Sequence, residues 1–171
     1  MTMQMNEQFD LAFNFLQNTG THLFLTGKAG TGKTTFLKRL KEVSPKRMIV
    51  VAPTGVAAIN AGGVTIHSFF QLPFGPYIPS VGAAEGNQSN NYSNKFSRDK
   101  INIIRSLDLL VIDEVSMVRA DLLDAISDVL CRYKDRTKPF GGVQLLLIGD
   151  LQQLAPVAKD EDWNLLKDHY A

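Results

Sequence analysis

The chain has 171 residues, of which 44% are hydrophobic and 20% are charged, so it can bury the core of one domain and is neither disordered nor collagen-like. Eighteen basic and seventeen acidic side chains leave a formal net charge of +1, which confines any contact with nucleic acid to a local patch. The single cysteine, Cys131, excludes an internal disulfide and a cysteine-based metal cluster. We expect one domain over residues 1–171, in a reducing compartment.

Membrane insertion and secretion are not expected. The longest apolar runs, such as 109–112 and 145–148, fall far below the ~20 residues that a bilayer span needs. The start, MTMQMNEQFD, has no basic residue followed by an apolar stretch and does not read as a signal peptide. We therefore expect a soluble, intracellular protein with no membrane partner.

The N-terminal part predicts a helix followed by a strand. Residues 7–17 place Leu11, Phe15 and Leu16 on one side of a half-buried helix. The apolar run 22–26 then ends in glycine, which indicates a buried strand that leads into a glycine loop.

The same alternation continues along the chain. Helical spacing over 33–42 is broken at Pro45, and a second apolar strand is predicted at 48–52. Further runs of this kind lie at 109–113 and 144–149. Four short, continuous apolar strands separated by helices indicate a mainly parallel sheet covered on both faces. The predicted fold class is a three-layer α/β domain.

Two segments have a distinct character. About half of the positions in 72–98 are Pro, Gly, Ser or Asn, so this segment is either a mobile surface loop or a functional insertion near a ligand. Residues 119–134 form a predicted amphipathic helix. Its apolar face carries Leu122, Ile126, Val129 and Tyr133, and its other face carries Asp121, Asp124 and Asp128. We expect these aspartates to face solvent and not to bind a metal.

A phosphate loop is predicted at residues 27–34, which read GKAGTGKT and match GxxxxGK[ST] between a strand and a helix. Such a loop points successive backbone N–H groups at phosphate oxygens, at the N-terminus of a helix. Lys33 can reach the β- and γ-phosphates, and Thr34 can offer its hydroxyl to Mg²⁺. Lys28 either binds phosphate or is solvated. The predicted nucleotide ligands are Gly27, Ala29, Gly30, Thr31, Gly32, Lys33, Thr34 and Thr35.

The carboxylates after the third apolar run narrow the choice among a kinase, a GTPase and a motor. Asp113 follows a buried strand and can hold the Mg²⁺ shell. Glu114 reaches the same site only if the strand already ends there, because neighbours in a strand point to opposite faces. So placed, Glu114 is a general base for water; otherwise it is an exposed strand-end carboxylate.

A glutamine is expected at the same edge. The segment GDLQQLAP, residues 149–156, follows a buried strand, and the ends of such strands lie at the ligand edge of the sheet. An amide there can donate to the γ-phosphate and accept from water. Gln152 competes for this role, but the spacing from Gly149 favours Gln153. The predicted catalytic residues are Lys33, Glu114 and Gln153, a set that disfavours a small-molecule kinase.

The chain resembles the N-terminal motor domain of the PIF (petite integration frequency) helicases, superfamily-one DNA helicases. Four segments carry the resemblance in order: GKAGTGKT (27–34), APTGVAAINAGGVTIHSFF (52–70), LLVIDEVSMV (109–118) and LIGDLQQLAPV (147–157). Only 72–98 falls outside it, and Ala155 departs from it, since the family usually has proline there. The resemblance implies a RecA-like P-loop NTPase fold and makes Gln8, in Asn6-Glu7-Gln8, a candidate reader of adenine. A helix-surface glutamine is the alternative.

The resemblance also implies an activity: hydrolysis of Mg-ATP that drives 5'-3' translocation on single-stranded DNA and unwinding, in repair, recombination and telomere maintenance. The implied partners are single-stranded DNA, duplex or quadruplex junctions, and a second, C-terminal motor domain of the same protein that supplies arginines to the transition state. The chain is then a fragment of a monomeric helicase, cytoplasmic in a bacterium and nuclear or mitochondrial in a eukaryote. The alternative is a nucleotide-dependent single-stranded DNA-binding module with little turnover of its own.

The expected DNA contacts lie within residues 52–70. A hydroxyl at Thr54 and an unshielded N–H at Gly55 suit a DNA phosphate, and Gly62 and Gly63 would let a strand approach closely. Aromatic rings can stack on bases, which makes His67 and Phe69 candidates, although Phe69 adjoins Phe70 and at least one of these two rings should be core. The expected DNA-binding residues are Thr54, Gly55, Gly63, His67 and Phe69.

Overall fold

The computed structural model describes residues 7–78 and 96–170, so residues 79–95 of the predicted insertion lie outside the described residues. Its centre is one parallel sheet of five strands in the order β1-β5-β4-β2-β3. The strands are β1 Leu23–Thr26, β2 Met48–Ala52, β3 Val64–Thr65, β4 Leu109–Ile112 and β5 Gln144–Gly149. The four predicted strands are confirmed. The two-residue strand β3 was not predicted, because so short a segment has no hydrophobic period.

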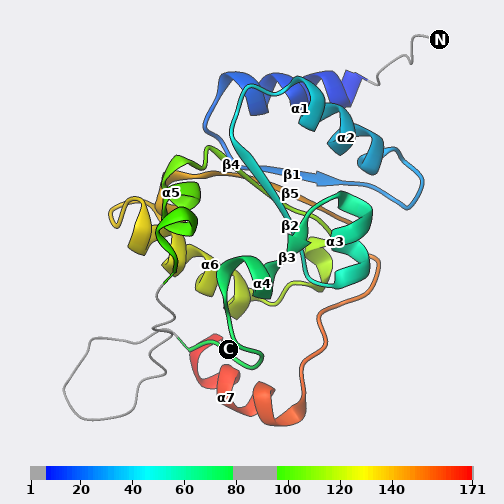
Figure 1. Cartoon of the computed structure of the whole chain (residues 1–171). Coiled ribbons are helices and arrows are strands. Elements are labelled where there is room, and N and C mark those ends of the chain that lie inside the picture. The colour runs from blue at the N-terminus through cyan, green and yellow to red at the C-terminus, as the bar shows by residue number, and fades with distance from the viewer. Residues whose placement is uncertain (1–6, 79–95, 171) are drawn as a thin grey trace.

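Seven α-helices pack around this sheet in the described ranges (Figure 1). They are α1 Glu7–Asn18, α2 Lys33–Val43, α3 Gly55–Ala61, α4 Ile66–Phe70, α5 Arg98–Ser106, α6 Ala120–Tyr133 and α7 Asp160–Tyr170, with short 3-10 turns η1 Val115–Met117 and η2 Pro139–Gly142. Helices α1, α2 and α6 match predicted ones, whereas the other four were not predicted. None of the helices over these ranges is both long enough and apolar enough to cross a bilayer.

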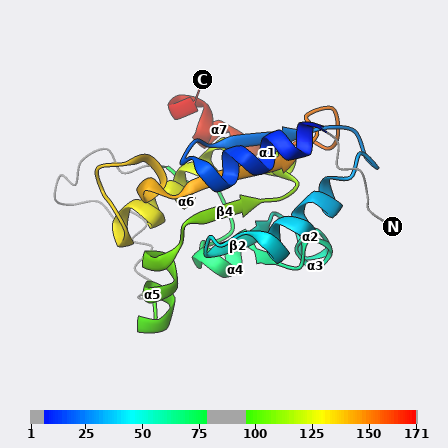
Figure 2. The same ribbon diagram turned by 90° about the horizontal axis from the view of Figure 1, so that it is seen from above.

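Alternate residues of the central strand β4 face opposite sides of the sheet. Leu109 and Val111 belong to the core beneath α1 and α2, whereas Leu110 and Ile112 belong to the core shared with α4, α5 and α6. All four are fully buried, and each such side chain stabilises the fold by roughly 1.5–3 kcal/mol. The result is the three-layer α/β architecture, with α1 and α2 above the sheet and α4 and α6 below it in Figure 1. Figure 2 gives the view from above, in which α5 projects to one side.

Helix α1 buries a different face from the predicted one. Leu11 and Phe15 are 53% and 40% exposed, so their predicted burial is wrong, while Leu16 is buried as expected. The packed stripe instead runs through Phe9 and Phe13, whose rings lie 5.1 and 4.8 Å from the ring of Phe36 on α2. The apolar residues of this helix cover more than one face, so periodicity alone could not select the buried one.

The polar face of α6 is not simply solvated, which corrects a second prediction. Asp121 is only 2% exposed. The guanidinium of Arg119 compensates its buried charge by donating hydrogen bonds of 2.7 and 2.9 Å to the two carboxylate oxygens. Asp124 accepts a 2.6 Å hydrogen bond from the hydroxyl of Tyr170 on α7. Asp128 accepts one from the hydroxyl of Tyr77. These aspartates attach neighbouring segments to α6, and the described residues contain no group of three or more potential metal ligands.

Candidate functional site

The predicted nucleotide residues converge on one edge of the sheet. All strands are parallel, and the register pairs Thr26 with Gly149 and Ile112 with both Leu147 and Val51. The segments that follow β1, β5, β4 and β2 therefore leave from the same, carboxyl edge, which is where open α/β sheets bind ligands. These segments carry the phosphate loop, Gln153, the Asp113-Glu114 pair and Thr54.

The phosphate loop curls between β1 and α2 as its glycines allow. Gly30 and Gly32 have φ of 80° and 91°, a left-handed conformation that costs glycine little. Gly32 precedes the first residue of α2, so the loop ends at a helix N-terminus, where backbone N–H groups favour an anion. Within the loop, the N–H and the hydroxyl of Thr31 both donate to the carbonyl of Lys28, at 3.3 and 2.8 Å.

Lys33 lies over its own loop. Its ammonium donates to the carbonyl of Gly27 and, at 2.9 Å, to that of Lys28. Both acceptors are neutral, and an ammonium bonds more strongly to an anionic oxygen. The side chain is therefore placed to exchange loop carbonyls for phosphate oxygens.

Asp113 is a partly buried carboxylate beside two ammonium groups. Burial raises its pKa, while the backbone N–H of Glu114, 3.0 Å from Oδ1, and the charges of Lys33 and Lys41 act in the opposite direction. Asp113 and Lys33 both lie in segments that follow strands at the same edge of the sheet. A carboxylate there suits a cation shared with phosphate oxygens.

Glu114 lies beyond the end of its strand, which is the condition under which the sequence analysis expected it to reach the nucleotide site. Strand β4 ends at Ile112, and Glu114 adopts φ 52° and ψ 43°, so it does not continue the alternation of the strand. A left-handed conformation is uncommon for a residue other than glycine and is found disproportionately at functional sites. The turn is closed by the N–H of Met117, which donates to the carbonyl of Glu114 at 3.0 Å.

Gln152 and Gln153 lie in an exposed turn after β5. Asp150, which is 8% exposed, organises this turn: its carboxylate accepts from the N–H of Gln152 and its carbonyl from that of Gln153, both at 3.0 Å. Both glutamines thus lie at the predicted edge, and Gln153 stays a prediction.

A cavity of about 420 Å³ adjoins the phosphate loop and is lined by Gln8, Phe9, Gly27, Thr31 and Lys33, among others. This volume lies within the usual range for small-molecule sites. Gln8 from α1 therefore shares a hollow with the phosphate loop, and its role in reading a base stays a prediction. Asn6 lies outside the described residues.

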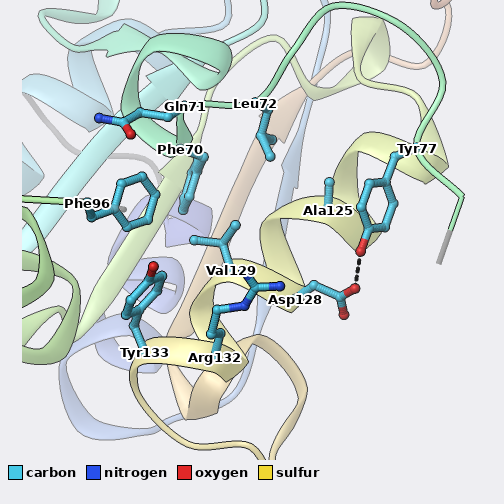
Figure 3. Close-up of a pocket in the computed structure, with 10 residues that line it drawn as sticks. All are labelled: Phe70, Gln71, Leu72, Tyr77, Phe96, Ala125, Asp128, Val129, Arg132 and Tyr133. Carbon is cyan, nitrogen blue, oxygen red and sulfur yellow. Dashed lines mark hydrogen bonds between the residues drawn. The ribbon is translucent and has the colours of Figure 1, made fainter. Parts of the chain in front are cut away.

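A second hollow, drawn in Figure 3, lies between α6 and the ends of the predicted insertion. Leu72, Tyr77, Phe96 and Val129 are among the residues around it. Its volume of about 30 Å³ is far below the roughly 300–1,000 Å³ of ligand pockets, so it is not a nucleotide site. The Tyr77–Asp128 hydrogen bond closes one side of it.

Three predicted DNA contacts lie on or beside α3. Thr54 caps this helix, its hydroxyl oxygen accepting from the N–H of Ala57 at 3.2 Å, and Gly55 has open space where a side chain would stand. Gly63 has a role inside the fold: a Cβ there would lie 2.3 Å from the carbonyl oxygen of Val50. Close packing against β2 therefore requires glycine at position 63, irrespective of any DNA.

The aromatic candidates divide into one buried ring and one accessible pair. Phe69 is 5% exposed, packed edge-on against Phe70 and covered by the ammonium of Lys100, 3.7 Å from its centroid. Both rings of the Phe69-Phe70 pair are thus core in this structure, and a DNA contact at the ring of Phe69 stays a prediction. His67 is instead stacked on Phe74, at 4.7 Å between centroids and 23° between planes.

Phe74, which the sequence analysis did not single out, is 89% exposed. Its neighbours Pro73, Gly75 and Pro76 were the available signal, because a large ring among such residues is typical of an exposed turn. Burial, and then the Arg119 guanidinium, lower the pKa of His67, which favours the neutral form of the stacked imidazole.

A partly buried ionic cluster holds the backbone that follows Phe74. Arg119 donates to the carbonyl of Gly75 at 2.9 Å and contacts Asp162 of α7 at 3.4 Å while it grips Asp121. The carboxylate of Asp121 also accepts a 2.8 Å hydrogen bond from the backbone N–H of Tyr77. The segment directly after the exposed ring is thus anchored at Gly75 and Tyr77.

Comparison with known proteins gives a consistent result. A family model described as PIF1-like helicase matches residues 3–164. The ATP-dependent DNA helicase PIF1 of Saccharomyces cerevisiae is 36% identical over 151 residues, which is 85% of this chain and 16% of that protein. Crystal structures of Bacteroides Pif1, one bound to single-stranded DNA and one in complex with ADP-AlF4, each have a TM-score of 0.87, at 47% and 48% identity. Each comparison covers 99% of this chain and 37% of the Bacteroides chain.

Proposed function

Because this chain belongs to the PIF1-like helicase family, we propose that it is the N-terminal, RecA-like motor domain of an ATP-dependent DNA helicase that unwinds DNA as it moves 5'-3' along a single strand. The observation that carries the proposal is the convergence of the phosphate loop, Asp113, Glu114 and the Gln153 turn on one sheet edge. The chain spans only 16% of the yeast relative and 37% of the Bacteroides chain. A second motor domain elsewhere in the protein is therefore part of the proposal.

Nucleotide binding is assigned to the phosphate loop and Gln8. The loop N–H groups and Lys33 would hold the phosphates, and the cavity between the loop and α1 would hold the base beside Gln8. Use of nucleotide accords with the Bacteroides relative, which was crystallised with ADP-AlF4. We propose specifically that the nucleotide is ATP and that Gln8 recognises its adenine.

The residues present fit Mg²⁺. Thr34 supplies a hydroxyl at the start of α2, and Asp113 supplies a carboxylate whose burial disfavours an uncompensated charge. Two oxygen ligands completed by phosphate oxygens and water are typical of Mg²⁺ in nucleotide sites. When bound, Mg²⁺ would neutralise charge that develops on the phosphates.

Hydrolysis is assigned to Glu114, Lys33 and Gln153. Glu114 would take a proton from the attacking water. It lies beyond the end of β4, so the alternation of side chains along the strand does not force it onto the face opposite to Asp113. Lys33 would stabilise charge on the γ-phosphate oxygens. Gln153, at the end of the neighbouring strand, would contact the γ-phosphate and so distinguish ATP from ADP.

Single-stranded DNA binding is assigned to Thr54, Gly55, His67 and Phe74. Thr54 and Gly55 suit a phosphate, and the His67–Phe74 stack offers an aromatic face. Stacking on such rings is tolerant of sequence, as a translocating motor requires. A relative crystallised with single-stranded DNA, and a related Pif1 structure described as a basis for DNA unwinding at forked duplex DNA, support this assignment.

The proposed function is tested by strand displacement with the intact protein on a duplex that carries a 5' single-stranded tail. We expect unwinding that requires ATP and Mg²⁺ and is lost in Lys33→Ala. By calorimetry, the same variant should bind ATP about 10- to 100-fold more weakly, the effect of losing hydrogen bonds to a charged group. Lys38→Ala, which removes an exposed lysine from α2, is the matched control. Unchanged ATP affinity in Lys33→Ala would contradict the phosphate-loop assignment.

Phe74→Ala should weaken single-stranded DNA binding by roughly 5- to 150-fold, the range that corresponds to 1–3 kcal/mol for one stacked base. ATP affinity should not change, because Phe74 lies outside the nucleotide cavity. Fluorescence anisotropy with a labelled oligonucleotide measures the effect. The control is Leu165→Ala, which removes an exposed apolar side chain from α7. Equal DNA affinity in the two variants would remove Phe74 from the DNA surface.

A further inference from the structure

Ser116 carries a buried hydroxyl with no partner. The residue is 7% exposed, and its Oγ finds no hydrogen-bond partner among the residues that the structure describes. Buried side-chain hydroxyls are nearly always bonded, because leaving one unpaired costs its full desolvation. An exception two residues after Glu114 needs an explanation.

The turn that contains Ser116 rests directly on the end of β5. A Cβ added at Gly149 would lie 3.0 Å from Cγ1 of Val115 and 3.2 Å from the backbone nitrogen of Ser116. Gly149 leads at once to Asp150, which holds the Gln152-Gln153 turn. Ser116 therefore lies where two segments meet. One carries Glu114, the proposed general base, and the other leads to Gln153, the proposed γ-phosphate contact.

Two unfavourable features adjoin each other in this turn. Glu114 has the left-handed backbone described above, and such strain persists only where the surroundings enforce it. The unpaired hydroxyl lies in the 3-10 turn that follows, which is held by two 3.0 Å backbone hydrogen bonds, Met117 to Glu114 and Val118 to Val115. A small movement of this turn against β5 could relieve both features together.

We propose that Ser116 is a positioning residue of the ATPase: its hydroxyl gains a hydrogen-bond partner when bound nucleotide draws the Glu114 turn and the Gln153 turn into their reactive arrangement. The hydroxyl then stabilises the site when nucleotide is bound, and it does not stabilise the conformation described here. The inference rests on the proposed function, because it assigns Ser116 to the hydrolysis step. Ser116 acts on Glu114 and Gln153 and touches no reacting atom.

Ser116→Ala in the intact protein separates this role from a purely structural one. Without nucleotide, its thermal unfolding midpoint should equal or exceed that of the wild type, because the change removes an unpaired buried group. Its DNA-stimulated kcat should fall about threefold to tenfold, the equivalent of one net hydrogen bond. The KM for ATP should stay unchanged, because the phosphate loop is intact. The rise in midpoint on adding ADP-AlF4 should be smaller than in the wild type.

Ser127 provides the matched control, because its hydroxyl oxygen has a partner, the N–H of Phe140 at 3.1 Å. Ser127→Ala should lower the unfolding midpoint and leave kcat unchanged, the reverse of the Ser116→Ala pattern. A midpoint lowered equally in both variants, or a kcat and ADP-AlF4 response equal to wild type in Ser116→Ala, would overturn the inference. Wild-type protein without ATP turnover would overturn the proposed function and this inference together.

Discussion

Glu114→Gln in the intact protein should lower ATP turnover by about 10²- to 10⁴-fold, the usual contribution of a general base, and should leave ATP affinity unchanged. Glutamine has nearly the shape of glutamate, so it can keep the left-handed turn after β4 but cannot accept a proton from water. The phosphate loop is untouched. Steady-state hydrolysis gives the rate, and calorimetry gives the affinity.

Glu42→Gln is the control for this prediction, since it makes the same charge change at an exposed position of α2. It should hydrolyse ATP at the wild-type rate. If Glu114→Gln retains turnover within about tenfold of the wild type, Glu114 is not the base, and another carboxylate at the sheet edge must be sought.

Residues 1–171 on their own should hydrolyse ATP about 10³- to 10⁵-fold more slowly than the intact protein and should not unwind DNA. In phosphate-loop enzymes, an arginine that meets the transferring phosphate is worth about that much in rate. Arg119, the arginine nearest to Glu114 in the sequence, is held by Asp121, Asp162 and the carbonyl of Gly75. The proposed second motor domain would supply the missing charge.

Parallel ATPase and strand-displacement assays on the two proteins measure this difference. Circular dichroism and nucleotide binding by the 171-residue chain show whether it is folded, so that a slow rate is not mistaken for unfolding. Single-stranded DNA binding should be weak with a shallow salt dependence, because a net charge of +1 releases few counterions. Unwinding by this chain alone would contradict the need for a second domain and direct mutagenesis to Arg119 and Arg136.

The sequence predicted the features that arise from local pattern. Continuous apolar runs such as 109–112 indicated buried parallel strands, and the glycines of 27–34 indicated a phosphate loop, since both depend on residues adjacent in the chain. The requirement that the strand end before Glu114 could be stated beforehand, and the structure meets it. In this way the edge that carries the candidate nucleotide site could be foreseen.

Features that depend on distant partners could not be foreseen. Asp121 is buried because Tyr77, 44 positions earlier, donates to it and Arg119 neutralises it. Neither contact leaves a periodic signal. Which of the adjacent rings Phe69 and Phe70 would enter the core depended on tertiary packing, and the structure buries both, with Lys100 over Phe69. Tertiary packing selected the buried face of α1 against the simple amphipathic pattern, whereas α6 packs its predicted apolar face on the core and buries Asp121 in addition.

The close approach of Gly63 to the Val50 carbonyl bears on how mutational screens of residues 52–70 should be read. Any side chain at position 63 must displace the backbone of β2, so such a variant will score as defective in every assay that needs folded protein. An invariant glycine in this segment would then report selection for packing, even where a binding screen ranks it first. Measuring the abundance of folded protein beside the affinity of each variant separates the two kinds of constraint.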